Sequence, residues 1–512
     1  MIATALLLTL AVGALSHLVY LCYFHPLAQY PGPWLARFTN FWRLLAFRSG
    51  RQHLTELALH RRYGHVVRVG PNWLSFETLA DFEAIYGFNR DIEKDEFYNF
   101  GRSNKRQGFS LFTAKTDAQH RDRRKKVVTP ALTLAKVGGY VEVVRKNVGV
   151  LLARLDDAVV VVAATQRDGK EGKVNVARIL HRFTIDTSLE VIYGPHVCPQ
   201  PVTDIPATAG FPEAIKLAGK SAWTASLLPL PAWFMSLRIV MALTGRLDNS
   251  NNKHATPVNL AAVAATSAKL IFNPQREELL SQHQQNSILK HWVALPSDDS
   301  RKMPPSELWS EAFNLVLAGT GSSAAALTAL LHRLGLGAGK PWQTKIRAEI
   351  AAQQSNDIPS SSTFPVLFAV IKETLRLDAP FPTAFPRTIR AGAENALPGL
   401  PTALPVGTRV SASTFVLGRS HRLWGADADE WKPERWLDGD HHEDLDERFV
   451  AFSKGARQCV GRDLAILMTA SAAIAVLKQW ELSSVGALEG NSSFLEMSYD
   501  SCWLRFEETN NE

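Results

Sequence analysis

The sequence has 512 residues, of which 46% are hydrophobic and 21% are charged. This composition supports a large buried core and excludes an intrinsically disordered chain. The formal net charge of +7 is modest for this length, which argues against a nucleic-acid-binding protein but permits a local basic patch. No CxxC pair occurs, which argues against a disulfide framework and a structural zinc site. The four cysteines are Cys22, Cys198, Cys459 and Cys502.

Residues 1–24 predict a transmembrane anchor. They contain no Asp, Glu, Lys or Arg, and an α-helix of this length rises by roughly 30 Å, enough to cross a bilayer core. A cleaved secretory signal is the alternative, and the lack of a basic start argues against it. Four arginines follow between residues 37 and 51, and the positive-inside rule places this side in the cytosol. Three prolines in residues 25–35 predict a stiff extended hinge.

Residues 36–512 predict one large domain that is mainly helical with short strands. A turn at Gly70-Pro71-Asn72 separates two strand candidates and indicates a hairpin. A long helix begins near Ser306, and its apolar character nearly all round places it in the middle of the domain. The segment 195–259 shows no clean periodicity. The predicted strands cover residues 65–69, 73–76, 388–390 and 409–413, and the predicted helices cover 306–334, 363–377 and 462–479.

A cysteine loop, FSKGARQCVG at residues 452–461, precedes the last predicted helix. A helix N-terminus stabilises an anion such as a thiolate, and glycines let the backbone approach a flat ligand closely. The alternative is a buried cysteine in a glycine-rich turn. The pattern FxxGxRxCxG resembles the haem loop of the cytochrome P450 family. The resemblance implies that Cys459 ligates the iron of haem b, that Gly455 lets the loop approach the ring, and that Phe452 packs beside the sulfur.

Two further motifs follow the order of this family. Glu373 and Arg376 match ExxR, in which positions i and i+3 share one helix face. Arg435 lies in the segment Pro433-Glu434-Arg435-Trp436, which matches PERW. ExxR alone is a weak signal that usually marks an exposed ion pair. The resemblance implies that Glu373, Arg376 and Arg435 form a buried structural network that braces the haem loop.

Haem carries two propionates, so basic side chains are expected at its edge. The resemblance assigns this role to Arg457, to Arg387 after Phe385-Pro386, and to His120 and Arg124, which match HxxxR at i and i+4 of a predicted helix. The same helix carries a run of further basic residues. A solvated helix face is the ordinary interpretation of such a run. The position of His120 and Arg124 favours reductase docking instead, through Arg121, Arg123, Lys125 and Lys126.

The long central helix departs from the family at its catalytic segment. Ala318 and Gly319 match AGxDT, but Gly321 replaces the acid and Ser322 replaces the threonine. The resemblance makes Gly319 and Ser322 the catalytic positions of this helix. A serine keeps the hydroxyl, whereas a glycine side chain cannot relay a proton. Either water and Ser322 carry the protons, or the reaction is altered, for example to oxidative coupling, ring formation or substrate-assisted proton delivery.

The resemblance covers about residues 25–506 and implies the cytochrome P450 fold, mainly α with small β-sheets. The hinge resembles microsomal members from filamentous fungi, many of which act in secondary metabolism. We therefore expect a single-pass protein of the endoplasmic reticulum membrane with a cytosolic monooxygenase domain. Its partners would be dioxygen, a small hydrophobic substrate and an NADPH-cytochrome reductase, with no nucleic acid. An oxidase that couples bonds without inserting oxygen and a non-enzymatic haem-binding protein are the alternatives.

Overall fold

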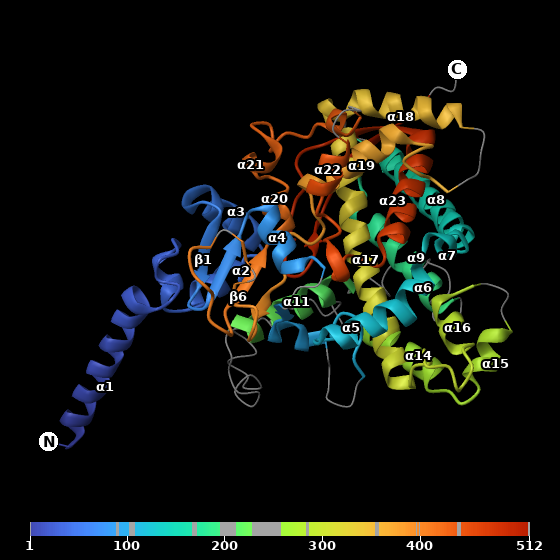
Figure 1. The fold of residues 1–512 in the computed structure, drawn as a ribbon. Helices are drawn as coiled ribbons and strands as arrows, with labels where there is room; N and C mark the ends of the chain where they lie inside the picture. The colour runs from blue at the N-terminus through green and yellow to red at the C-terminus, as the bar shows by residue number, and fades with distance from the viewer. Residues whose placement is uncertain are drawn as a thin grey trace.

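The protein is mainly helical with small sheets, as expected (Figure 1). A computed structural model describes residues 2–88, 92–101, 108–165, 172–194, 211–227, 258–282, 286–353, 358–395, 397–398, 400–437 and 442–509. Cys198 and most of the segment 195–259 lie outside the described residues.

The N-terminal helix α1 (Ile2–Val19) stands away from the body (Figure 1). None of its residues is buried, and it continues into a π-helix at Tyr20–Phe24. Together these residues form a span of 23 residues with a mean hydropathy of 2.1, which is long and apolar enough to cross a membrane. The central helix α17 (Pro305–Gly335) also passes this test, but most of it is buried inside the protein, as is typical of a core helix.

The proline-rich segment after α1 packs onto the body. Leu27 is fully buried, and the Arg68 N–H donates to the Pro31 carbonyl at 2.7 Å. The Arg68 guanidinium also donates to the Leu21 carbonyl at 3.3 Å. Contact with the body therefore begins before the prolines, so residues 25–35 form an outer layer of the domain, and α1 alone projects from it.

A five-stranded sheet lies beside this segment, with the order β1-β2-β6-β5-β3. The hairpin predicted around Gly70-Pro71-Asn72 is confirmed, because β1 and β2 pair antiparallel. β6 runs parallel to β2, and β5 pairs antiparallel with both β6 and β3. The strands are β1 (Val66–Gly70), β2 (Trp73–Phe76), β3 (Ile92–Lys94), β5 (Arg387–Ile389) and β6 (Arg409–Ala412).

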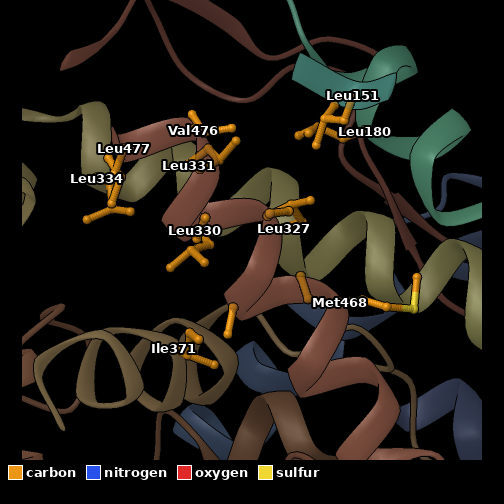
Figure 2. Close-up of a cluster of buried hydrophobic side chains, with 14 of the residues drawn as sticks. Leu151, Leu180, Leu327, Leu330, Leu331, Leu334, Ile371, Met468, Val476 and Leu477 are labelled. Atoms are coloured by element: carbon orange, nitrogen blue, oxygen red, sulfur yellow. The ribbon is translucent and has the colours of Figure 1, made fainter. Parts of the chain in front are cut away.

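The core forms around α17, which begins and ends within one residue of the predicted bounds. Helices α9 (Ala177–Tyr193), α19 (Pro365–Leu377) and α23 (Arg462–Gln479) pack against it, and α8 (Val141–Thr165) packs against α9 and α23. Figure 2 shows the contact, in which leucines of α17 lie among apolar side chains of the other four helices. Full burial of each such side chain is worth about 1.5–3 kcal/mol. This packing fixes the N-terminus of α23, where the cysteine loop ends. The side chains labelled in Figure 2 are Leu151, Leu180, Leu327, Leu330, Leu331, Leu334, Ile371, Met468, Val476 and Leu477.

A C-terminal group of strands was not predicted from the sequence. β4 (Val174–Asn175), β10 (Trp503–Glu508) and β7 (Trp480–Ser484) form one small sheet. β8 (Ser492–Ser493) and β9 (Met497–Ser498) form a hairpin, and β9 packs against α17.

The other helices complete the body around these layers. They are α2 (Phe41–Arg48), α3 (Gln52–Tyr63), α4 (Leu79–Tyr86), α5 (Asp117–Arg123), α6 (Thr129–Leu132), α7 (Leu134–Gly138), α11 (Phe211–Leu227), α14 (Val258–Ile271), α15 (Arg276–Ser281), α16 (Ile288–Val293), α18 (Lys340–Ala352), α20 (Thr414–Leu417), α21 (His421–Trp424) and α22 (His442–Arg448), with short 3-10 helices at Trp34–Arg37, Glu96–Gly101, Gly337–Gly339, Pro433–Trp436 and Gly455–Arg457 and a π-helix at Arg124–Val128.

Candidate active site

The cysteine loop is held in one shape by its backbone. The Cys459 N–H donates to the Phe452 carbonyl at 2.8 Å, which closes the loop on itself. Gly455 has a φ of +72°, and a Cβ at this position would overlap the backbone of Gly87. Only glycine satisfies both conditions. The loop therefore lies directly against the end of α4 and leads into α23.

The thiol of Cys459 is solvent-accessible although protein surrounds it on most sides. Burial raises the pKa of this thiol, while a hydrogen bond from the Gly461 N–H and the charges of Arg124 and Arg462 act to lower it. The adjacent Val460 packs against the apolar cluster of α17. A bound metal cation would complete the stabilisation of the thiolate, which the protein alone provides only in part.

Basic side chains from several elements gather around His120. This imidazole is buried, and its pKa falls to about 2, first because of burial and then because of nearby cations. The charged groups that lower the pKa of His120 are all basic. The set complements a bound group with negative charges, such as the two propionates of haem. The cations are Lys94 of β3, Arg124, Arg387 of β5 and Arg457.

The predicted propionate-binding residues also connect the elements of the site. Arg124 donates to the Gln458 carbonyl at 2.5 Å, which joins it to the cysteine loop. Arg387 donates to the Tyr98 hydroxyl, and Arg457 donates to the Lys115 carbonyl at 3.4 Å. α5 ends at Arg123 and a π-helix begins at Arg124. His120 and Arg124 are therefore not positions i and i+4 of one regular α-helix, contrary to the prediction. They still act on one region, because the charge of Arg124 lowers the pKa of His120.

The three residues of the predicted bracing network lie together in the structure. Arg376 donates to both carboxylate oxygens of Glu373 at 2.8 Å, and Arg435 donates to one of them at 3.1 Å. The Trp436 indole and the Lys432 N–H complete the partners of this carboxylate. The other N–H groups of the Arg376 guanidinium donate to backbone carbonyls of the segment that leads to the PERW turn. These are the carbonyls of Gly418, Ala428 and Glu430.

The segment of α17 that was predicted to be catalytic is locally open. Ala318 is exposed, whereas most of the helix C-terminal to it is buried. The Ser322 hydroxyl donates to the Ala318 carbonyl at 2.6 Å. A Cβ at Gly319 would lie 3.1 Å from the Ser188 hydroxyl of α9, so close packing of α9 accounts for this glycine. The accessible small residue is thus Ala318, one position before the predicted Gly319.

Sequence reasoning missed Glu496, which follows β8 and precedes β9. Its carboxyl lies against Gly321, where any Cβ would overlap it, and it accepts a hydrogen bond from the Ser322 N–H. Burial raises the pKa of this carboxyl to about 8. The missing acid at position 321 was the one sequence signal for such a residue. Nothing in the sequence of residues 491–499 indicates where the side chains of this segment lie.

The basic run on α5 and the π-helix that follows it contains both exposed and buried residues. Arg121, Lys125 and Lys126 are exposed, and Lys126 pairs with Asp122 at 2.5 Å. Arg123 is buried, where it forms ion pairs with Glu307 and Glu311 of α17. The prediction that Arg123 belongs to a docking surface is therefore wrong, because its charge faces the interior and holds α5 to α17.

The family model for cytochrome P450 matches residues 31–488. The chain belongs to the cytochrome P450 family. This P450 is 26% identical over 503 residues to benzoate 4-monooxygenase bphA of Aspergillus niger, with 92% of this chain and 90% of that relative covered. It is 28% identical over 479 residues to a cytochrome P450 monooxygenase of Pyricularia oryzae, with 90% and 85% covered.

A solved structure supports the same fold. The crystal structure of the cytochrome P450DA heme domain superimposes with a TM-score of 0.69 at 16% identity, and covers 94% of this P450 and 98% of that chain. The family and the fold together imply haem with a cysteine thiolate ligand. Relatives named as monooxygenases place this P450 among oxygenase enzymes.

Proposed function

We propose that this P450 is a membrane-anchored monooxygenase in which Cys459 provides the thiolate ligand of haem b. The observation that carries the proposal is the accessible Cys459 thiol, held by a closed loop, together with the group of cations around His120. When bound, the haem supplies the two-electron activation of dioxygen that oxidises the substrate.

The residues of the chain would position and shield this group. Arg124, Arg387 and Arg457, with His120, would bind the propionates, since cations paired with carboxylates form strong hydrogen bonds. Phe452 and the backbone of the loop would keep water from the sulfur. The Glu373 network would hold the segment between α19 and the cysteine loop in place. Its role would be to retain the haem, and it would take no part in the reaction.

Electrons would reach the site at the surface formed by α5 and the π-helix Arg124–Val128. Arg121, Lys125 and Lys126 are exposed there, and Arg124, in the same stretch of chain, contacts the cysteine loop. A surface of this charge favours docking of an acidic partner. We propose that the partner is an NADPH-cytochrome reductase of the endoplasmic reticulum, with α1 as the membrane anchor and the body in the cytosol.

The proposed substrate is a small hydrophobic molecule, which would be hydroxylated or similarly oxidised in secondary metabolism. The support is the likeness to fungal monooxygenases, one of which is named for benzoate. Isotopically labelled dioxygen tests the reaction type. One labelled oxygen atom in the product supports monooxygenation. A product without label supports the second candidate, oxidative coupling or ring formation, which the glycine at position 321 favours.

The thiolate assignment is tested by the spectrum of the reduced protein with carbon monoxide. We expect an absorption band at about 450 nm, since thiolate donation shifts the spectrum to the red. Cys459→Ser should abolish this band, and the control variant Cys22→Ser should keep it. A thiolate-type band that survives in Cys459→Ser would disprove the assignment.

A further inference from the structure

The β8–β9 hairpin holds a carboxyl group at a fixed place beside α17. Its strands pair through Ser493 and Met497. The Ser493 N–H donates to the Gly50 carbonyl and the Met497 N–H donates to the Pro380 carbonyl, both at 2.8 Å. Glu496 lies just before Met497 and is buried. Its position is therefore determined by two separate parts of the body.

The Glu496 carboxyl and the glycine at position 321 depend on each other. A Cβ at Gly321 would overlap the carboxyl group, so no larger residue fits there while the carboxyl stays in place. The carboxyl accepts a hydrogen bond from the N–H of Ser322, the residue whose hydroxyl donates to the accessible Ala318. The carboxyl thus occupies, in space, the position of the side chain that Gly321 lacks.

The carboxyl has no cationic partner within the described part of the chain. Burial is the dominant effect on Glu496, and it raises the pKa to about 8, so the group holds a proton at neutral pH. The charges of the neighbouring elements are engaged with each other: Arg182 and Arg154 with Asp186, and Lys216 with Asp500. A buried acid without a cation costs stability, which favours a chemical role. Other titratable groups on this side are Arg178, His181, Glu213 and Tyr499.

A cavity connects this carboxyl with the surface. Its volume is about 610 Å³, and Gly321 and Glu496 form part of its wall. The exposed Arg178, Glu213 and Asp500 line it elsewhere. This space has room for on the order of ten or more water molecules, and the polar side chains in its mainly apolar lining provide hydrogen-bond partners for some of them. Water in the cavity can therefore return a proton to Glu496.

We infer that Glu496 is the proton-relay acid of this P450, supplied by the β8–β9 hairpin in place of an acid on α17. The inference rests on the proposed monooxygenase function. Each turnover uses one dioxygen, two electrons from NADPH and two protons, and yields an oxygenated product and one water. The Glu496 hydroxyl releases a proton toward water beside the Ser322 hydroxyl and regains one from water in the cavity. Glu496 thus supplies protons through the Ser322 hydroxyl and does not itself touch the reacting atoms.

The test uses the full-length haem-loaded chain with NADPH-cytochrome reductase in air-saturated buffer, without added substrate. Dioxygen is then reduced to hydrogen peroxide with two electrons and two protons, or to two waters with four of each, so NADPH consumption still requires protons. Glu496→Gln keeps the shape of the side chain and an acceptor for the Ser322 N–H, but it cannot release a proton. We expect its NADPH consumption to fall roughly ten-fold or more. In the wild type, consumption should decline as the pH rises through about 8, because Glu496 then loses its proton. In Glu496→Gln this decline should disappear.

Electron delivery is measured separately by replacing dioxygen with carbon monoxide. The rate at which the band at about 450 nm forms should be the same in the wild type and in Glu496→Gln, because this step needs no proton relay. If the wild type gives no such band, the proposed function fails. If the wild type gives the band but Glu496→Gln keeps the NADPH consumption and pH profile of the wild type, only the relay inference is overturned.

A double variant separates a relay from a purely structural contact. Gly321→Asp combined with Glu496→Gly moves the carboxyl back to α17 and removes the overlap. We expect it to consume NADPH at least several-fold faster than Glu496→Gly alone and to regain a decline with pH. It also decides the question if Glu496→Gln fails to fold. A double variant that keeps the carbon monoxide band but is as slow as Glu496→Gly would overturn the inference.

Discussion

At the scale of single residues, a buried ion-pair network joins α19 to the segment that contains the PERW turn. Glu373 and Arg376 are almost completely buried, and Glu373 also binds Arg435. A buried ion pair repays its desolvation only when every donor and acceptor has a partner. Here Arg376 has the carboxylate and three carbonyls, so the network is complete. Removing one member therefore leaves the others uncompensated.

Glu373→Ala should lower the free energy of unfolding by about 3–5 kcal/mol, since Arg376 and Arg435 lose their shared anion. Haem should also be lost more readily. The matched control is Arg61→Ala, which breaks a half-exposed pair with Asp429 and should cost less than about 1 kcal/mol. Thermal unfolding and haem content measure both effects. Equal destabilisation by the two variants would contradict a special role for the Glu373 network.

The pKa of Glu496 predicts a dependence of stability on pH. This carboxyl has an ordinary pKa of 4.5 in the unfolded chain and a raised pKa of about 8 in the folded protein. The folded state therefore holds a proton that the unfolded chain has released, and stability falls as the pH rises from about 5 to about 8. Glu496→Gln does not titrate, so it should become more stable relative to the wild type as the pH increases.

Melting temperatures of both proteins at pH 5.5, 7 and 8.5 test this prediction. Other titrating groups cancel in the comparison, because the two chains differ at one position. We expect the difference to change by up to about 1.4 kcal/mol for each pH unit in this range. A difference in melting temperature that stays constant from pH 5.5 to pH 8.5 would show that the carboxyl is not protonated in the folded state.

At the scale of elements, the sequence predicts helices with local signals and misses elements placed by distant contacts. Helices 306–334 and 462–479 agree with α17 and α23 to within one residue, because their apolar patterns and end residues are local. The β8–β9 hairpin has strands of two residues each, too short for a periodic pattern. Its place is set by Gly50 and Pro380, and so the position of Glu496 could not be read from the sequence.

The same contrast explains the error at Arg123. A run of basic residues in the sequence does not show which of them faces inward. The structure shows that Glu307 and Glu311 lie on α17 opposite Arg123, far away in the sequence. The three exposed residues Arg121, Lys125 and Lys126 remain as the predicted docking surface.

Arg121→Glu combined with Lys125→Glu should slow electron transfer from the reductase several-fold at low ionic strength. High salt should reduce the difference from the wild type, because surface charges are screened. The control is Arg422→Glu with Lys478→Glu, which changes the net charge equally on exposed residues of α21 and at the end of α23. The rate at which the carbon monoxide band forms is the measurement. An equal effect of both pairs would indicate a general charge effect and no docking site on α5 and the following π-helix.

At the scale of the whole molecule, the body and the N-terminal helix meet different surroundings. α1 is apolar all round and is exposed over its whole length, which is stable only in an apolar environment. The body begins at the π-helix, where Leu21 is buried and its carbonyl accepts from Arg68. Contact with the body thus begins at Leu21, within the apolar span Ile2–Phe24 and before the prolines that the sequence marks as a hinge.

Two truncations test where the anchor ends. Removal of residues 2–19 should release the protein from membranes with little change in melting temperature, because none of these residues is buried in the body. Removal of residues 2–27 should also release it but lower its stability, since Leu27 is fully buried and Arg68 loses the Leu21 carbonyl. Sedimentation with membranes and thermal unfolding measure the two effects. If the shorter truncation still sediments with membranes, the body has a second membrane-binding surface. Secretion of the protein on expression of the full-length chain would show that α1 is not a membrane anchor.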